Sequence, residues 1–179
     1  GILADAADDA TVVVDEVSTS GDFSDGISAF AGEDATVIAG TVSTTGFGSD
    51  GITADAGDDA TVVVESVTTA GHFAHGIDAY ADTGDAIVVA GTVATAGAFS
   101  DGITADAGED ATVVVESVTT AGFGSDGITV FAGDDALVLA ETVTTGGDFA
   151  HGILADAADD ATVVVDEVST GGDFSDGVT

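Results

Sequence analysis

The chain of 179 residues contains no Lys, Arg, Cys, Pro, Met or Trp. Without Lys or Arg it cannot neutralise phosphate groups, so we expect no binding to nucleic acid. The absence of Cys excludes disulfides and thiolate metal sites. No apolar run approaches the roughly 20 residues that a membrane-spanning helix needs, and we therefore expect no membrane insertion.

The chain is instead rich in acidic and apolar residues. The chain has 34 Asp and Glu residues, three His and a formal net charge of −34. Such a surface favours cations, basic proteins or copies of itself bridged by cations as partners. Hydrophobic residues make up 45% of the chain, which argues against a disordered acidic tail. We expect a folded acidic protein that recruits positive charge from outside.

One unit of about 25 residues is repeated along the whole chain. The units begin at Gly1, Gly26, Gly51, Gly76, Gly102, Gly127 and Gly152, and an eighth begins at Gly177. A fixed period of this size is typical of a solenoid, in which each unit buries its apolar face against its neighbours. We therefore predict one repeat array over residues 1–179, as part of a longer array.

Each unit has three short segments that predict strands. In the first unit these are Ile2–Ala6, Ala10–Val14 and Val17–Thr19, rich in β-branched or alternating apolar residues. Acid pairs and a Gly-rich segment between them predict turns, one of them at Asp15-Glu16. The pattern predicts an all-β fold, a parallel β-helix (β-solenoid) of about seven coils with three short strands each.

Four short motifs carry a resemblance to a known group of proteins. Ser24-Asp25-Gly26-Ile27, Ala74-His75-Gly76-Ile77, Ala10-Thr11-Val12 and Val17-Ser18-Thr19 recur in the order seen in autotransporter passengers and filamentous-haemagglutinin-like adhesins. The chain resembles the β-helical repeats of those proteins throughout its length. The resemblance implies a right-handed β-helix, secretion and a role outside the cell or at its surface.

Acid pairs recur in the first turn of six units. Stacking would place like charges about 4.8 Å apart, where each pair costs about 0.9 kcal/mol even in bulk water. Bound cations, high ionic strength or protonation must offset this cost, and oxygen-only ligands favour Ca²⁺. The alternative is a diffuse cloud of counterions.

In the fourth unit, Asp82-Thr83-Gly84-Asp85 has an extra residue at which we expect an ion ladder to break or change. The candidate metal ligands are Asp8, Asp9, Glu33, Asp34, Asp58, Asp59, Glu109, Asp110, Asp134, Asp135, Asp159 and Asp160.

Two apolar columns are candidate interfaces. The fifth position of each unit alternates between Asp and an aromatic residue, and the thirteenth is always Val, Ile or Leu between two other apolar positions. One of these neighbouring sets must face outward from a strand. We expect the thirteenth position to lie beside the aromatic residues in one exposed apolar stripe, typical of an interaction surface. The alternative is a bulge that turns this position inward. The candidate interface residues are Phe30, Tyr80, Phe131, Val13, Val63, Val114 and Val164.

The last turn of each unit follows a rhythm of three units, and the fifth position a rhythm of two, so both close after six units. His75 and His151 replace Asp in that turn, either as one charged residue for another or as a pH-sensitive contact.

An enzyme is not expected, because every unit offers the same acids and no long loop builds a pocket. The sequence favours a structural protein of an extracellular fibre or adhesin stalk. A calcium-binding module is the alternative. A third possibility, ice binding, would use the column Thr19, Thr44, Thr69, Thr95, Thr120, Thr145 and Thr170.

Overall fold

The computed structural model covers residues 1–179 and contains fourteen strands and no helix. Seven strands of five residues form one parallel sheet, the short-strand sheet, and seven strands of ten residues form another, the long-strand sheet. The short strands are β1 (Ile2–Ala6), β3 (Ile27–Ala31), β5 (Ile52–Ala56), β7 (Ile77–Ala81), β9 (Ile103–Ala107), β11 (Ile128–Ala132) and β13 (Ile153–Ala157). The long strands are β2 (Ala10–Thr19), β4 (Ala35–Thr44), β6 (Ala60–Thr69), β8 (Ala86–Thr95), β10 (Ala111–Thr120), β12 (Ala136–Thr145) and β14 (Ala161–Thr170).

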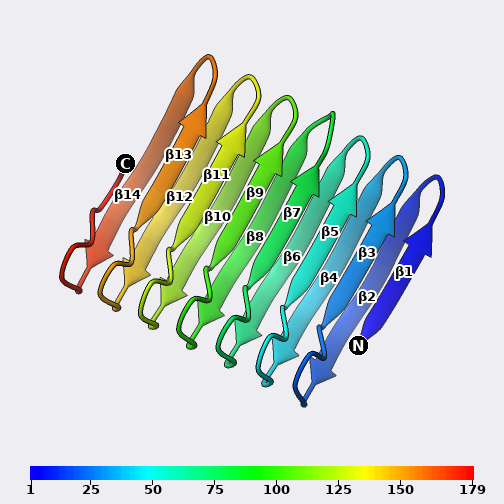
Figure 1. Cartoon of the computed structure of the whole chain (residues 1–179), viewed down its shortest axis with the longest axis horizontal. Coiled ribbons are helices and arrows are strands. Elements are labelled where there is room, and N and C mark those ends of the chain that lie inside the picture. Colours follow the sequence, from blue (N-terminus) through cyan, green and yellow to red (C-terminus); the bar gives the residue numbers. More distant parts are fainter.

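The chain winds as a flattened β-solenoid, which confirms the predicted fold class. Each coil contributes one short and one long strand, and each strand pairs with its counterpart in the next coil at the same position of the repeat. In Figure 1 the nearer strands run upward, the farther strands run downward and the coils advance to the left, which is a right-handed winding. Parallel strands joined by crossovers have this hand almost without exception.

Each coil has two strands, not the three that we expected. The second and third predicted strands are one continuous strand, Ala10–Thr19 in the first coil. Asp15-Glu16 is a bend within it, because both residues are exposed while Val12 and Val17 on either side are buried. The pairing register passes over residue 15. Two consecutive outward residues let the strand turn slightly and still point apolar side chains inward at both ends.

The core lies between the two sheets. A column of isoleucines from the short strands, Ile27, Ile52, Ile77, Ile103, Ile128 and Ile153, is fully buried. Inward-facing Val and Ala residues of the long strands pack against it in one continuous cluster. Because side chains alternate along a strand, the remaining residues form the two outer faces of the solenoid.

Two kinds of turn close each coil. The acidic turn joins a short strand to the following long strand and contains the acid pairs, as in residues 7–9. The phenylalanine turn joins a long strand to the next short strand, as in residues 20–26. It ends in a Gly at which an added Cβ would collide with the next coil: for Gly76, with the Gly102 carbonyl and a methyl of Val93. Only glycine lets adjacent coils approach this closely.

Candidate functional site

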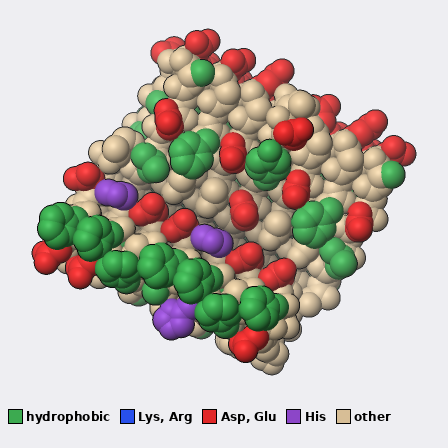
Figure 2. Space-filling model, viewed as in Figure 1, with side chains coloured by type: hydrophobic (Ala, Val, Ile, Leu, Met, Phe, Trp, Pro, Cys, Tyr) green, Lys and Arg blue, Asp and Glu red, His purple; other side chains and the backbone are tan.

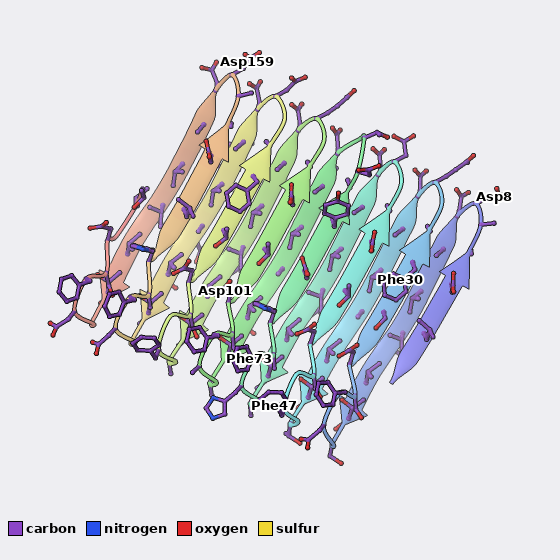
Figure 3. The ribbon with its side chains drawn as sticks, in the orientation of Figure 1. Asp8, Phe30, Phe47, Phe73, Asp101 and Asp159 are labelled. Atoms are coloured by element: carbon purple, nitrogen blue, oxygen red, sulfur yellow. The ribbon has the colours of Figure 1, made fainter.

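The predicted metal ligands form two parallel columns along the edge made by the acidic turns (Figure 3). From Asp34 onward, the second acid of each pair takes part in a hydrogen-bonded ladder. The backbone N–H of Asp59 donates to Asp34 Oδ1 at 3.3 Å, and the N–H of Asp110 donates to Asp85 Oδ1 at 3.1 Å. Each carboxylate therefore holds the backbone of the next coil, which offsets part of the repulsion expected between like charges.

The extra residue in the fourth coil does not interrupt this hydrogen-bonded ladder. The N–H of Asp85 donates to Asp59 Oδ1 at 2.9 Å, so Asp85 takes the place of the second acid. Gly84 takes the place of the first acid, because its carbonyl accepts the N–H of Glu109 at 3.0 Å. Only the first column is missing a carboxylate.

Nowhere in the chain do three or more acidic or imidazole groups converge closely enough to hold a metal ion. The predicted ligands Asp8, Asp9, Glu33, Asp34, Asp58, Asp59, Glu109, Asp110, Asp134, Asp135, Asp159 and Asp160 are all brought to the acidic-turn edge. They form columns, with neighbours one coil apart, and do not form a closed cage.

A second ladder runs through the phenylalanine turns. This Asp–His row consists of Asp25, Asp50, His75, Asp101, Asp126, His151 and Asp176. The N–H of His75 donates to Asp50 Oδ1 at 2.7 Å, and the N–H of Asp101 donates to His75 Nδ1 at 3.1 Å. Histidine thus replaces aspartate as a ladder acceptor, and this role requires an unprotonated Nδ1.

The Asp–His row contains two of the three carboxylates whose pKa is clearly raised. Burial raises the pKa of Asp50 and of Asp101 above the usual Asp value, although each accepts a backbone hydrogen bond that acts in the opposite direction. Asp78, three residues after His75 on β7, also has its pKa raised, chiefly by burial and further by Asp50. In the other coils this position is Leu, Ser or Thr, so the fourth coil has a local concentration of acid.

The two predicted interface columns are both exposed but lie on opposite faces. Phe30, Tyr80 and Phe131 belong to the short-strand sheet and are 37–41% exposed. Figure 2, which views that sheet, shows rings alternating with acidic side chains across it. The thirteenth-position residues belong to the long-strand sheet. The core lies between the sheets, so the single apolar stripe that we expected does not exist.

The outward column of the long-strand sheet is apolar over the full length of the solenoid. It comprises Val13, Ile38, Val63, Val89, Val114, Leu139 and Val164. Exposures of 72% for Val13 and 39% for Val63 and Val89 settle the alternatives in favour of the outward orientation. A shallow groove of about 670 Å³ follows this column from Ile38 to Leu139, with Glu65, Glu116 and Glu141 along one side. We call these seven residues the apolar column.

The threonine column considered for ice binding faces inward. Thr44, Thr69, Thr95, Thr120 and Thr145 are at most 3% exposed. Each donates its hydroxyl to a carbonyl five residues later, as Thr95 does to Ser100 at 2.7 Å. These hydroxyls stabilise the phenylalanine turn from inside the solenoid. The threonine column is therefore not exposed, and it cannot form the surface that ice binding would need.

One prominent surface feature was not predicted. Every phenylalanine turn carries one exposed Phe, and the seven rings stack along the edge of the solenoid (Figures 2 and 3). A signal was present, since each unit has one Phe just before its end. In the second and fifth units the Phe comes one residue earlier. An alignment of the units without gaps therefore does not place the seven Phe residues in one column.

Comparison of the chain with protein-family models, with curated proteins and with solved structures finds no match. The structure has no helix of the length and apolarity that crossing a membrane requires.

Proposed function

We propose that this protein is a structural rod of an extracellular fibre or of an adhesin stalk, as its resemblance to autotransporter and filamentous-haemagglutinin-like repeats implies. The observation that carries the proposal is the apolar column, which runs uninterrupted over all seven coils on an outer face. Exposed contiguous apolar surface of this kind marks an interaction surface. The surrounding coils offer uniform stacking and no enclosed cleft.

A second copy of the solenoid is the partner that fits the column. Both surfaces would repeat at the spacing between parallel strands, about 4.8 Å, so one register of contact is satisfied at every coil. The flat outer face of the long-strand sheet adds small hydroxyl side chains, such as those of Thr112 and Ser117, which permit close approach. Lateral pairing then buries the apolar column and groove of each rod.

The charge of −34 on each rod opposes this pairing. Glu65, Glu116 and Glu141 lie beside the groove, so two paired faces bring carboxylates together. At physiological ionic strength, salt largely screens the repulsion between exposed charges more than about 8 Å apart, and higher salt shortens that distance. We therefore expect pairing to require salt or divalent cations, in keeping with an extracellular setting.

The test replaces the apolar column with charge. In the triple variant Val63→Asp, Val89→Asp and Val114→Asp we expect single rods under conditions in which the unmodified protein forms lateral bundles, seen by negative-stain microscopy and sedimentation velocity. The matched control is Phe30→Asp, Tyr80→Asp and Phe131→Asp on the opposite face, where neighbouring coils already carry Asp. Bundles that survive the triple variant, or an unmodified protein that never bundles in salt, would overturn the proposal.

The second candidate function is a calcium-binding acidic solenoid, favoured by the ladder of second acids. One oxygen of each carboxylate is fixed by a backbone N–H, as Asp135 Oδ1 is by the N–H of Asp160 at 3.1 Å. An ion midway between carboxylates of adjacent coils would lie about 2.4 Å from each, within the range for Ca²⁺. Calorimetric titration with CaCl₂ tests this candidate. Saturable heat that is lost in Asp110→Asn with Asp135→Asn supports it, and no heat beyond that of matched NaCl contradicts it.

A further inference from the structure

The seven phenylalanine side chains form a continuous ladder. The ladder consists of Phe23, Phe47, Phe73, Phe99, Phe123, Phe149 and Phe174. Neighbouring ring centroids are 5.1–5.6 Å apart, the distance of favourable aromatic pairs. Every ring remains between 44% and 78% exposed. The ladder thus presents a strip of aromatic surface to solvent along the edge of the phenylalanine turns.

The backbone departs from its preferred conformation to keep these rings in line. Phe73 and Phe99 both have a φ of 54°, in the left-handed region, and three other ladder residues share it. For a residue with a Cβ, this backbone conformation is less favourable by on the order of 1 kcal/mol. In the second and fifth coils, Gly48 and Gly124 occupy this position and Phe47 and Phe123 come one residue earlier.

Two different local sequences therefore place a ring at the same point of the ladder. Phe47, displaced by one residue, still packs against both neighbouring rings, edge-to-face with Phe23 at 5.6 Å and tilted against Phe73 at 5.4 Å between ring centroids. Burial does not explain this arrangement, because the rings are half-exposed. Strained residues at the surface point to an interaction.

Negative charge borders the ladder. The Asp–His row lies in the same turns, two or three residues after each ring, and Figure 2 shows it as a line of acidic and imidazole side chains beside the phenylalanines. Asp22, Asp148 and Asp173 directly precede ladder residues. The chain has no Lys or Arg to pair with these carboxylates, so a second copy would bring only more negative charge. Charge complementarity therefore requires a cationic partner.

We propose that the phenylalanine ladder and the Asp–His row together form a docking surface for a cationic polypeptide rich in Arg and Lys. Guanidinium groups stack on aromatic faces, and the aliphatic stems of Arg and Lys cover apolar surface while their charged ends reach carboxylates. An extended segment lying along the edge would meet a ring and an acid at every coil. This surface is separate from the apolar column, so the inference does not depend on lateral pairing of rods.

Fluorescein-labelled deca-arginine is the probe, and its binding is measured by fluorescence anisotropy at about 0.15 M and 0.5 M NaCl, where distant charges are screened. We expect Phe73→Gly with Phe99→Gly to weaken binding at least about tenfold, since two cation–π contacts are lost. Glycine is the chosen replacement because Gly48 and Gly124 already hold this backbone conformation, so the coils keep their fold. Circular dichroism and thermal unfolding verify that they do.

Two controls separate the ladder from general attraction to a polyanion. Phe30→Ala with Tyr80→Ala removes two exposed rings from the short-strand sheet and should leave the affinity unchanged. Asp101→Asn with Asp126→Asn removes charge beside the ladder and should weaken binding several-fold more than Asp110→Asn with Asp135→Asn, which removes equal charge from the acidic turns. Equal losses in the two charge variants, or unchanged affinity in the glycine variant, would overturn the proposal. Self-association that needs Phe73 and Phe99 would also overturn it, because the ladder would then serve a second copy.

Discussion

An aspartate in this solenoid has two opposing effects. Its carboxylate repels the same carboxylate in adjacent coils, and it also accepts the N–H of the next coil, as Asp101 does from Asp126 at 2.8 Å. A hydrogen bond to a charged acceptor of this kind is about twice as strong as one to a neutral acceptor. Sequence reasoning identified the columns and the cost of repulsion, but not the compensation, because the backbone N–H groups that point at these oxygens are set by the path of the turn.

An amide substitution separates the two effects. Asp110→Asn retains an acceptor oxygen for the N–H of Asp135 and removes one charge from the ladder. We expect it to stabilise the protein by about 1 kcal/mol at low ionic strength, and by less as salt screens the repulsion. Asp110→Ala loses the acceptor as well and should be less stable than Asp110→Asn. The free energy of unfolding at several salt concentrations gives the answer, and equal stability of the two variants would show that the ladder bond contributes nothing.

A half-buried carboxylate in the fourth coil, that of Asp78, gives stability an unusual pH dependence. Burial raises the pKa of Asp78 above its usual 3.8, Asp50, Asp55 and Asp106 raise it further, and His75 acts in the opposite direction. The folded state therefore binds the proton more tightly than the unfolded state. The resulting stability is fully present below pH 3.8 and is lost as pH rises through the raised value.

We therefore expect the Tm to rise as the pH is lowered from 7 toward that region. Asp78→Asn should raise the Tm at pH 7 and flatten this dependence, because the amide carries no charge to desolvate. The exposed Asp134→Asn serves as the control for the loss of one charge. An Asp78→Asn protein with the same pH slope as the Asp134→Asn protein would contradict the explanation.

For the strands, the alternation of side chains correctly predicted which residues face outward. The sequence was a poorer guide to where each strand ends within the coil. The repeat predicted the solenoid, the short strand Ile2–Ala6 and the outward orientation of Val13, because a period of two needs no tertiary information. The predicted turn at Asp15-Glu16 was wrong, since acidic residues occur in a bend as readily as in a turn. A separate expectation, that Phe30 lies beside Val13, was also wrong, because the acidic turn between the short and long strands puts these positions on opposite sheets.

Truncating a side chain of the core should lower the free energy of unfolding far more than truncating one on the outer face. Ile77 is fully buried between the sheets, whereas Val89 is 39% exposed in the apolar column. We expect Ile77→Ala to destabilise the protein by about 2–5 kcal/mol, since it opens a cavity. Val89→Ala should change the stability of the single rod by less than about 0.5 kcal/mol. Urea unfolding of dilute protein measures both, and a similar cost for the two would mean that the outer column is structurally required.

The Gly that ends each phenylalanine turn, where adjacent coils come into contact, gives a further prediction. Gly76→Ala directs a Cβ at the Gly102 carbonyl and a Val93 methyl, so we expect a loss of about 1–3 kcal/mol through overpacking. At Gly146 the nearest atom to an added Cβ is 3.8 Å away, and the three preceding coils have Ala at the equivalent position, as Ala121 shows. Gly146→Ala should therefore be neutral or stabilising by about 0.4–1 kcal/mol. Thermal unfolding distinguishes them, and equal Tm values would show that the coils can separate without cost.

For the whole molecule, net charge dominates the response to solution conditions. With 34 acids and no Lys or Arg, added salt relieves repulsion without breaking any Lys or Arg ion pair. We expect the Tm to rise steadily between about 0.01 M and 0.5 M NaCl. CaCl₂ at matched ionic strength should raise it further only if ions occupy the ladder of second acids. A Tm that is independent of salt would contradict the role assigned to charge repulsion.

The strict one-to-one stacking of coils has a consequence for how aligned rods scatter X-rays. Strands perpendicular to the long axis give a meridional reflection near 4.8 Å, the signature of amyloid, although here every strand pair is formed within one chain. The alternation of Asp and aromatic residues on the short-strand sheet doubles that repeat, and the rhythm of the phenylalanine turns triples it. Oriented fibres should therefore show weak layer lines at about 9.6 Å and 14.4 Å. Such lines distinguish an evolved solenoid from a misfolded aggregate with identical backbone spacing.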